Sequence, residues 1–294
     1  MNNTFRWLAV CTIALAFATA SIAWAQTYTT VDYPGADDTS LNGGPNAEGV
    51  AVGSYDAPGI AHGGFTYRRG VFTPVNVPWA GPLGTVPWWP NQDTLVGFYY
   101  DQKGAQHGFT LHNGRYTTVD FPGVAGTELT GINPEGDMAG QYCRDVDCND
   151  FHSLIRTRTG QFIGFDPPGA KLSYGATINA AGAMVGTSFT DSPPTDDGSH
   201  CYLLYRGRFT TIDFPGAIGT GCGANNAEGD IVGNYFDASD VSHAFLLRNG
   251  VFTSFDFPGA SATYAEGINS EGTIIGSYFD AAGHLHGFIR TPRR

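Results

Sequence analysis

The 294-residue sequence is poor in charge, and above all in positive charge. Asp, Glu, Lys and Arg make up 14% of the residues, against about 25% in average soluble domains. Only 15 Lys and Arg residues stand against 27 Asp and Glu residues, which gives a formal net charge of −12. A surface this acidic repels nucleic acid and anionic lipid, so we expect neither as a partner.

Helical periodicity is missing as well, and beyond the first 25 residues no apolar run is long enough to span a bilayer. Glycine, by contrast, is abundant: its 41 residues are roughly twice the usual share of about 7%. Each interior glycine destabilises a helix by about 1 kcal/mol. Disorder is excluded by 41% hydrophobic and 13% aromatic residues. The composition therefore predicts an all-β, turn-rich protein.

Residues 1–25 have the pattern of a secretory signal peptide. Arg6 precedes an apolar run from Trp7 to Ala20, and the segment ends in Ala23-Trp24-Ala25, an A-x-A cleavage site. The alternative, an uncleaved membrane anchor, would need a longer apolar stretch. We expect a mature chain that begins at Gln26, is secreted or periplasmic, and has no membrane span after cleavage.

Cysteine is scarce, with five residues, of which Cys11 lies in the signal peptide. In an oxidising compartment the other four are expected to form disulfides. Cys143 and Cys148 flank a short loop, which favours pairing between them and leaves Cys201 with Cys222. Four cysteines nevertheless allow three connectivities. The spacing does not match that of a structural zinc site.

The expected mature chain, 26–294, is a single domain built from one repeated motif. Alignment on Asp-Phe-Pro-Gly gives six units of 43 to 47 residues. Each unit contains four short segments with strand-like alternation, which we name A, B, C and D in their order within a blade, separated by Gly, Pro, Asn and Asp. An Asn-x-x-Gly turn separates A from B in most units. The units span 27–70, 71–114, 115–160, 161–207, 208–250 and 251–294.

Six units of about 44 residues with four strands each predict a six-bladed β-propeller. A solenoid is the competing architecture, but it would need distinct capping ends. Here the mature chain starts on a D strand, Thr27–Tyr33, and finishes on a C strand that begins at His286. We therefore expect the N-terminal strand to complete the last blade and close the ring. A closed ring leaves no sheet edge that demands a partner, so a monomer is expected.

The repeated residues also resemble a family. His243-Ala244-Phe245, together with the preceding Asn226-Ala-Glu-Gly-Asp-Ile-Val-Gly, is similar to the bacterial extracellular HAF-repeat proteins. The similarity covers nearly the whole mature chain. It departs in the second unit, at Trp88-Trp89-Pro90, and in the fourth, at the extended loop 191–198. The resemblance implies secretion and a repeat fold, and it implies no activity.

Six of the eight histidines occupy one place in the repeat, at the start of strand C. An aspartate closes strand B in each unit, and a catalytic reading would pair one such histidine with one aspartate. Six equivalent copies instead indicate a structural hydrogen bond that ties the B–C loop in each blade. The histidines are His62, His107, His152, His200, His243 and His286, and the aspartates are Asp56, Asp101, Asp145, Asp191, Asp237 and Asp280.

A second aspartate recurs at the exit from strand D, where we expect it to cap a turn. Its copies are Asp32, Asp120, Asp166, Asp213 and Asp256, with Asn76 as the exception. Calcium would need several oxygen ligands at one place, which single, regularly spaced carboxylates supply only if they converge at the central channel. Asp196 and Asp197 in the fourth unit offer a further candidate pair, for calcium or for glycoside hydrolysis. No cofactor is expected.

Functional residues are sought where the repeat is broken, on the face that collects the D–A and B–C connections. The second unit departs most strongly. Its aromatic rings suit stacking on a sugar, although the same rings are suited to the core between blades. The candidate ligand-binding residues are Trp79, Trp88, Trp89, Tyr99 and Tyr100.

Two functions follow as hypotheses. The first is a secreted binding or interaction module that recognises a polysaccharide or another cell-envelope component through its loops. The alternative is a secreted carbohydrate-active enzyme, a glycoside hydrolase or polysaccharide lyase with carboxylates at the channel mouth. The near-identity of the units favours the first, because an active site requires asymmetry.

Overall fold

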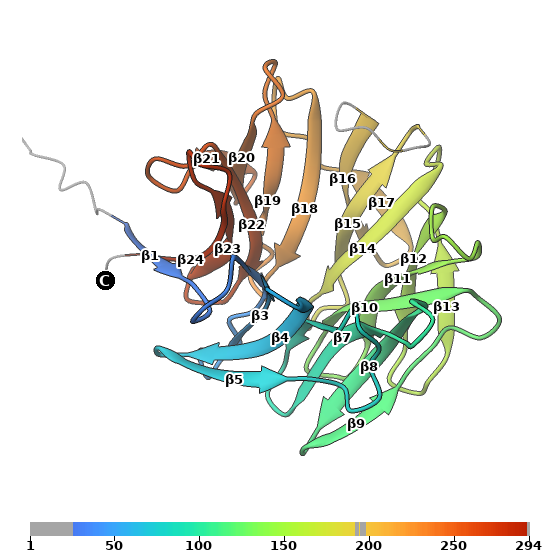
Figure 1. Cartoon of the computed structure of the whole chain (residues 1–294). Coiled ribbons are helices and arrows are strands. Elements are labelled where there is room, and N and C mark those ends of the chain that lie inside the picture. Colours follow the sequence, from blue (N-terminus) through green and yellow to red (C-terminus); the bar gives the residue numbers. More distant parts are fainter. Residues whose placement is uncertain (1–25, 192–193, 195–197, 293–294) are drawn as a thin grey trace, which may run out of the picture.

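The computed structural model describes residues 26–191, 194 and 198–292. The predicted signal peptide and the predicted pair Asp196 and Asp197 lie outside these residues. The described chain folds into 24 strands and six four-stranded antiparallel sheets, which are arranged as blades around a common centre (Figure 1). The predicted six-bladed β-propeller is therefore confirmed.

The first three blades follow one another along the chain, each running from its innermost to its outermost strand. Blade one contains β2 (Asp38–Gly43), β3 (Ala51–Ala57), β4 (Ile60–Arg68) and β5 (Val71–Val75). Blade two contains β6 (Thr85–Pro90), β7 (Thr94–Tyr100), β8 (Gln106–His112) and β9 (Arg115–Thr118). Blade three contains β10 (Gly126–Ile132), β11 (Met138–Cys143), β12 (Phe151–Arg156) and β13 (Phe162–Phe165).

The other three blades repeat this order, except that the last takes its outer strand from the N-terminus. Blade four contains β14 (Leu172–Ile178), β15 (Met184–Phe189), β16 (Ser199–Tyr205) and β17 (Arg208–Thr211). Blade five contains β18 (Gly219–Asn225), β19 (Ile231–Phe236), β20 (Ser242–Arg248) and β21 (Val251–Phe255). Blade six contains β22 (Ala262–Ile268), β23 (Ile274–Phe279), β24 (Leu285–Thr291) and β1 (Thr27–Val31).

Ring closure joins the two ends of the chain in one sheet. Strand β1 pairs antiparallel with β24 from Thr27 opposite Thr291 to Val31 opposite Gly287, and the two strands lie side by side in Figure 1. Val31 is almost fully buried, and Thr30 shares a hydrogen bond with the Tyr278 hydroxyl on β23. The predicted closure is thus confirmed, and it removes the open edge that β24 would otherwise present.

The core lies between the blades. The inner strands are buried along most of their length, as β10 is from Gly126 to Ile132, so each sheet packs side chains of both faces against its neighbours. The cluster between blades five and six, for example, contains Val232 and Ala244 from one blade and Ile274 and Phe288 from the other. Near the centre the blades converge until backbones touch. A side chain at Gly267 would collide with the carbonyl oxygen of Gly44 in the next blade, so this contact requires glycine.

The A–B turns form a ring of asparagines on one face of the propeller. Each Asn side-chain oxygen accepts one or two backbone N–H groups of its own turn; Asn269, for example, accepts those of Glu271 and Thr273. At five of the six blade junctions the side-chain amide then donates to the asparagine carbonyl of the next blade. These donors are Asn46, Asn91, Asn133, Asn179 and Asn226. The repeated Asn therefore holds both the turn and the junction between blades.

Candidate functional site on the loop face

The opposite face carries the D–A and B–C connections, and we call it the loop face. Each D–A connection meets the end of the second strand of the blade that it enters. The Ser261 amide, for instance, donates to the Phe279 carbonyl, and the Lys171 amide donates to the Phe189 carbonyl. The face predicted to collect the variable loops is therefore formed by these two sets of connections.

The repeated histidines lie on the loop face, and their main partner differs from the expected one. In five blades the imidazole Nδ1 lies 2.8–3.0 Å from the aspartate that follows the outer strand, not from the aspartate that closes the second strand. The pairs are His107–Asp120, His152–Asp166, His200–Asp213, His243–Asp256 and His286–Asp32. His62 has the expected aspartate, Asp56, as its nearest partner, at 3.1 Å, because its blade has Asn76 at the outer-strand position.

The aspartates that close the second strand serve mainly as turn caps. The Oδ1 atom of Asp237 accepts the backbone N–H groups of Ser239 and Val241, and these bonds are the first cause of the lowered pKa of Asp237. Asp101 and Asp280 accept the same pair of bonds and have lowered pKa values for the same reason. Their other oxygens approach the histidine Nε2 only at 3.5–3.7 Å. In blade three the nearby carboxylate is Asp150, at 3.9 Å, and not Asp145.

In blades two, five and six the repeated histidine therefore lies between two aspartates, one after the outer strand and one at the end of the second strand. Burial lowers the pKa of His243, but the hydrogen bonds and negative charges of Asp256 and Asp237 outweigh burial, so that the pKa is raised. His286 has a raised pKa for the same reasons, with Asp32 and Asp280 as partners. Five near-identical pairs around a ring form a repeated structural element. No single pair has the asymmetry of a catalytic site.

An aromatic stack supports this element in four blades. The aromatic residue after the outer-strand aspartate lies flat on a tyrosine of the next blade, with ring centroids 3.7–4.5 Å apart. The stacked pairs are Tyr33–Tyr55, Phe121–Tyr142, Phe214–Tyr235 and Phe257–Tyr278. The tyrosine ring in turn contacts the imidazole of the histidine beside it. The ring centroids of Tyr278 and His286, for example, are 5.1 Å apart. This stack connects neighbouring blades under the loops.

The predicted aromatic ligand-binding residues do not form one exposed surface. Trp79, on the connection into blade two, is 47% exposed, whereas Tyr99 is buried and shares a hydrogen bond with Thr118. Trp89 is half-buried and packs against two core clusters, one of blades five and six and one of blades two and three. The last two, Trp88 and Tyr100, are half-buried and each contacts the Phe98 ring.

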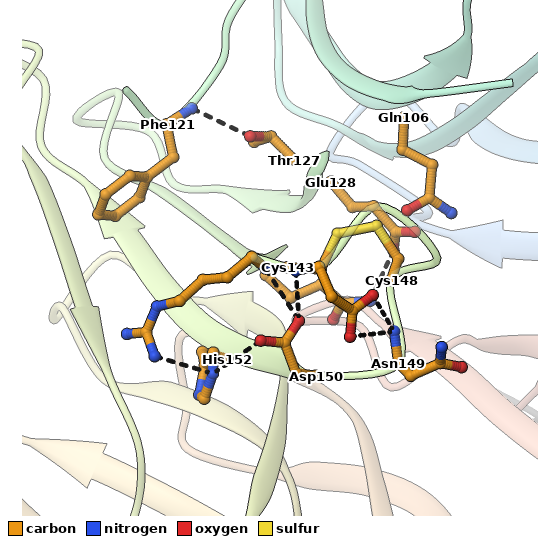
Figure 2. The surroundings of a disulfide bond; sticks show 12 residues. Gln106, Phe121, Thr127, Glu128, Cys143, Cys148, Asn149, Asp150 and His152 are labelled. Carbon is orange, nitrogen blue, oxygen red and sulfur yellow. Dashed lines mark hydrogen bonds and ion pairs between the residues drawn. A yellow bond between two sulfur atoms is a disulfide. The ribbon is translucent and has the colours of Figure 1, made fainter. Parts of the chain in front are cut away.

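Both predicted disulfides are present; one closes a loop within a blade and the other joins two blades. Cys143–Cys148 closes the loop between β11 and β12 of blade three, and Figure 2 shows Gln106 and Glu128 beside it. Cys201–Cys222 joins β16 of blade four to β18 of blade five. Two disulfides are consistent with an oxidising compartment.

Glu128 on β10 is a buried carboxyl group that the sequence analysis did not single out. Removal from water raises its pKa to about 7, although a hydrogen bond from Gln141, 2.5 Å long, partly opposes this shift. The nearby Oε1 atom of Gln106 is buried without a hydrogen-bond partner among the described residues. The strand pattern could not reveal Glu128, because it occupies one position of one unit while the other units have different residues there.

No group of three or more His, Cys, Asp or Glu residues suited to a metal ion occurs within the described part of the chain. Across the same residues, no helix is long and apolar enough to cross a membrane.

The comparisons with known proteins identify propellers of distant sequence. No family model and no curated protein sequence matches the chain. The structure is similar to a mutant of AofleA from Arthrobotrys oligospora, with 14% identity, a TM-score of 0.54, and 90% of this chain and 86% of that chain covered.

Two further structures have the same level of similarity. TolB from Acinetobacter baumannii has 12% identity and a TM-score of 0.52, with 80% of this chain and 61% of that chain covered. A lectin from Aleuria aurantia in complex with Fucα1-6GlcNAc has 8% identity and a TM-score of 0.52, with 86% of this chain and 91% of that chain covered. At these identities the likeness shows the fold alone.

Proposed function

We propose that the protein is a secreted or periplasmic binding module whose loop face recognises a carbohydrate of the cell envelope or its surroundings. The observation that carries the proposal is the division of the loop face. Its repeated polar groups are bonded to one another, whereas Trp79 is exposed. Ile60, Leu83 and Val146, on neighbouring connections, are also more than two-fifths exposed. An exposed indole suits the apolar face of a sugar ring.

Three further points support this function. The signal-peptide pattern of residues 1–25 and the two disulfides fit export. The resemblance to the extracellular HAF-repeat proteins fits the same location. Among the similar propellers, the Aleuria aurantia lectin is a fucose-specific protein, so this architecture is compatible with carbohydrate recognition.

A glycan panel tests the proposal. We expect the purified protein to bind at least one polysaccharide or oligosaccharide, and the Trp79→Ala substitution to weaken that binding roughly three- to tenfold, the contribution of one aromatic contact. The matched control is Tyr205→Ala, because Tyr205 is also exposed but lies at the β16–β17 hairpin, on the opposite face. Absence of binding across neutral and acidic glycans would contradict the proposed function.

One observation favours the enzymatic alternative. Glu128 has a pKa near 7, as a general acid of a glycosidase requires, and it lies on an inner strand near the loop face. Its hydrogen-bond partner is an amide, not a second carboxylate. Assays for new reducing ends and for unsaturated uronate test this alternative. Product formation that disappears in Glu128→Gln would replace the binding function with catalysis.

A further inference from the structure

Blade four departs from the others at two positions that face each other. Where four blades stack two aromatic rings, blade four has Pro167 after the outer-strand aspartate and Ser188 on β15. All five other blades have a tyrosine at the position of Ser188: Tyr55, Tyr99, Tyr142, Tyr235 and Tyr278. Blade four is therefore missing both members of the stack.

A pocket of about 400 Å³ lies at this place. Its lining includes Pro167, Pro168, Ser188, His200, Tyr202 and Asp213. The volume falls in the range of roughly 300–1,000 Å³ that is usual for small-molecule sites. The pocket thus coincides with the space that the tyrosine ring fills in the other blades.

The missing tyrosine leaves two groups of the repeat uncovered. The side chain of His200 is 41% exposed, and it lacks the tyrosine ring that contacts the repeated histidine in blades two, three, five and six. In blades two, five and six the tyrosine hydroxyl bonds a hydroxyl group on the outer strand, at Thr118, Ser254 and Thr30. The equivalent residue in blade four is Thr211, which lines the pocket, and its hydroxyl has no hydrogen bond with any described residue.

The chemistry of the pocket selects for a ring that carries hydroxyl groups. The place is filled by a six-membered tyrosine ring in the other blades, and here it is lined by Pro167, Pro168 and His200. Hydroxyl groups of Ser188, Thr190 and Thr211 and the carboxylate of Asp213 line it. A pyranose combines C–H faces with hydroxyl groups at its edge, and so it can use both kinds of surface.

The walls of the pocket are held in place. The Cys201–Cys222 disulfide anchors the strand that carries His200 to blade five. Tyr202 is fully buried, and its hydroxyl lies 2.7 Å from that of Ser153 in blade three. A site whose walls are fixed before binding loses little conformational entropy on binding.

We propose that the blade-four pocket is a saccharide-binding site that accepts one pyranose ring in place of the missing tyrosine. The assignment rests on the proposed carbohydrate-binding function and adds a second contact with the glycan on the loop face. It is independent of Trp79, which lies on the connection into blade two.

Filling the pocket with the residues of the other blades tests the assignment. The double variant Pro167→Phe and Ser188→Tyr restores the stack found at Phe257 and Tyr278. Isothermal titration with a saccharide that the glycan panel identifies should show affinity reduced at least tenfold, while the melting temperature stays equal or rises. Unchanged affinity in this folded variant would overturn the pocket assignment and leave the proposed function intact.

A second pair of variants decides the question if the filled variant does not fold. Thr211→Val removes one hydroxyl from the pocket and should weaken binding about two- to tenfold, the contribution of one hydrogen bond. Thr118→Val, the same change in blade two, breaks a bond to Tyr99 and should leave affinity unchanged. Equal affinities in the two variants would contradict the assignment.

The remaining outcomes are also decisive. A wild-type protein that binds no saccharide would contradict both the proposed function and the pocket. Binding of a phenol, such as N-acetyltyrosine amide, without any saccharide would show that the pocket accepts an aromatic ring and would overturn the pyranose assignment.

Discussion

At the scale of the residue, the histidine partners illustrate why proximity along the chain predicted only the longer of two contacts in most blades. His243 is six residues from Asp237 and thirteen from Asp256, so the sequence favoured Asp237. Pairing of β20 with β21 places Ala244 opposite Phe255, and this register brings Asp256 beside His243. Asp237 is meanwhile occupied by backbone N–H groups. The structural role of the histidines was predictable, whereas their partners depended on strand register.

Glu128 leads to a prediction about pH. Its pKa rises from 4.5 in the unfolded chain to about 7 in the folded protein, so the folded state retains a proton that the unfolded chain releases between these values. The free energy of unfolding should therefore fall as the pH rises through this window, by at most about 3 kcal/mol. Glu128→Gln keeps an acceptor for Gln141 without the charge, so it should stabilise the protein at pH 8 and have little effect at pH 4.

Urea unfolding of both proteins at pH 4, 6 and 8 measures this effect. Glu266 on β22 also has a pKa raised to about 7 by burial, so the pH dependence should shrink in Glu128→Gln and not vanish. Glu48→Gln, at an exposed glutamate in the first A–B turn, is the control. The prediction fails if the unfolding free energies of Glu128→Gln and the wild type differ equally at pH 4 and pH 8.

At the scale of the element, the two disulfides cross-link different kinds of structure. Cys143–Cys148 lies within one B–C loop, whereas Cys201–Cys222 connects two blades. The sequence favoured both pairings because the short loop suggested the first and the second followed. The repeat boundaries already place Cys201 and Cys222 in different units, and the structure adds that the bond joins β16 to β18.

The two disulfides should differ in their contribution to stability. A cross-link restricts the unfolded chain more when it closes a longer loop, and the sequence separations are 5 and 21 residues. Replacement of Cys201 and Cys222 by Ala should lower the free energy of unfolding by about 3 kcal/mol, and replacement of Cys143 and Cys148 by Ala by about 2 kcal/mol. Urea unfolding of the two double variants measures the difference, and a larger loss at the loop disulfide would contradict the chain-entropy argument.

The blade-four pocket also belongs to the scale of the element. Both substitutions that create it, Pro167 and Ser188, are visible once the units are aligned on their aromatic residues. Added aromatic residues and an added loop are easier to recognise in a sequence, and these features point to Trp88, Trp89 and residues 191–198 instead. A missing side chain becomes a site only when its neighbours are known, because Pro167, on the connection that enters blade four, and Ser188, on β15, meet only in the folded ring.

At the scale of the whole molecule, the repeat count and the closure were predictable because they depend on strand order alone. A chain that begins with a D strand and ends with a C strand has one way to complete its last blade. The structure adds the contacts that hold this junction. His286 on β24 bonds Asp32, which follows β1, and the guanidinium of Arg290 donates to the Gln26 side chain. Tyr28 packs edge-on against Phe257, which lies on the connection from blade five to blade six.

Removal of β1 should therefore destabilise the entire ring. A chain that begins at Asp32 loses the five paired residues of β1 and the buried side chain of Val31, and it exposes the edge of β24. We expect a lower urea midpoint and concentration-dependent association in size-exclusion chromatography. A circular permutant is the matched control: Thr291 is joined to Thr27 by Asn-Gly, as Asn249-Gly250 joins the paired residues Arg248 and Val251, and the chain is opened between Gly35 and Ala36. The permutant keeps every strand, so it should remain monodisperse and more stable than the truncated chain. A truncated chain as stable and as monodisperse as the full chain would show that the ring does not depend on its N-terminal strand.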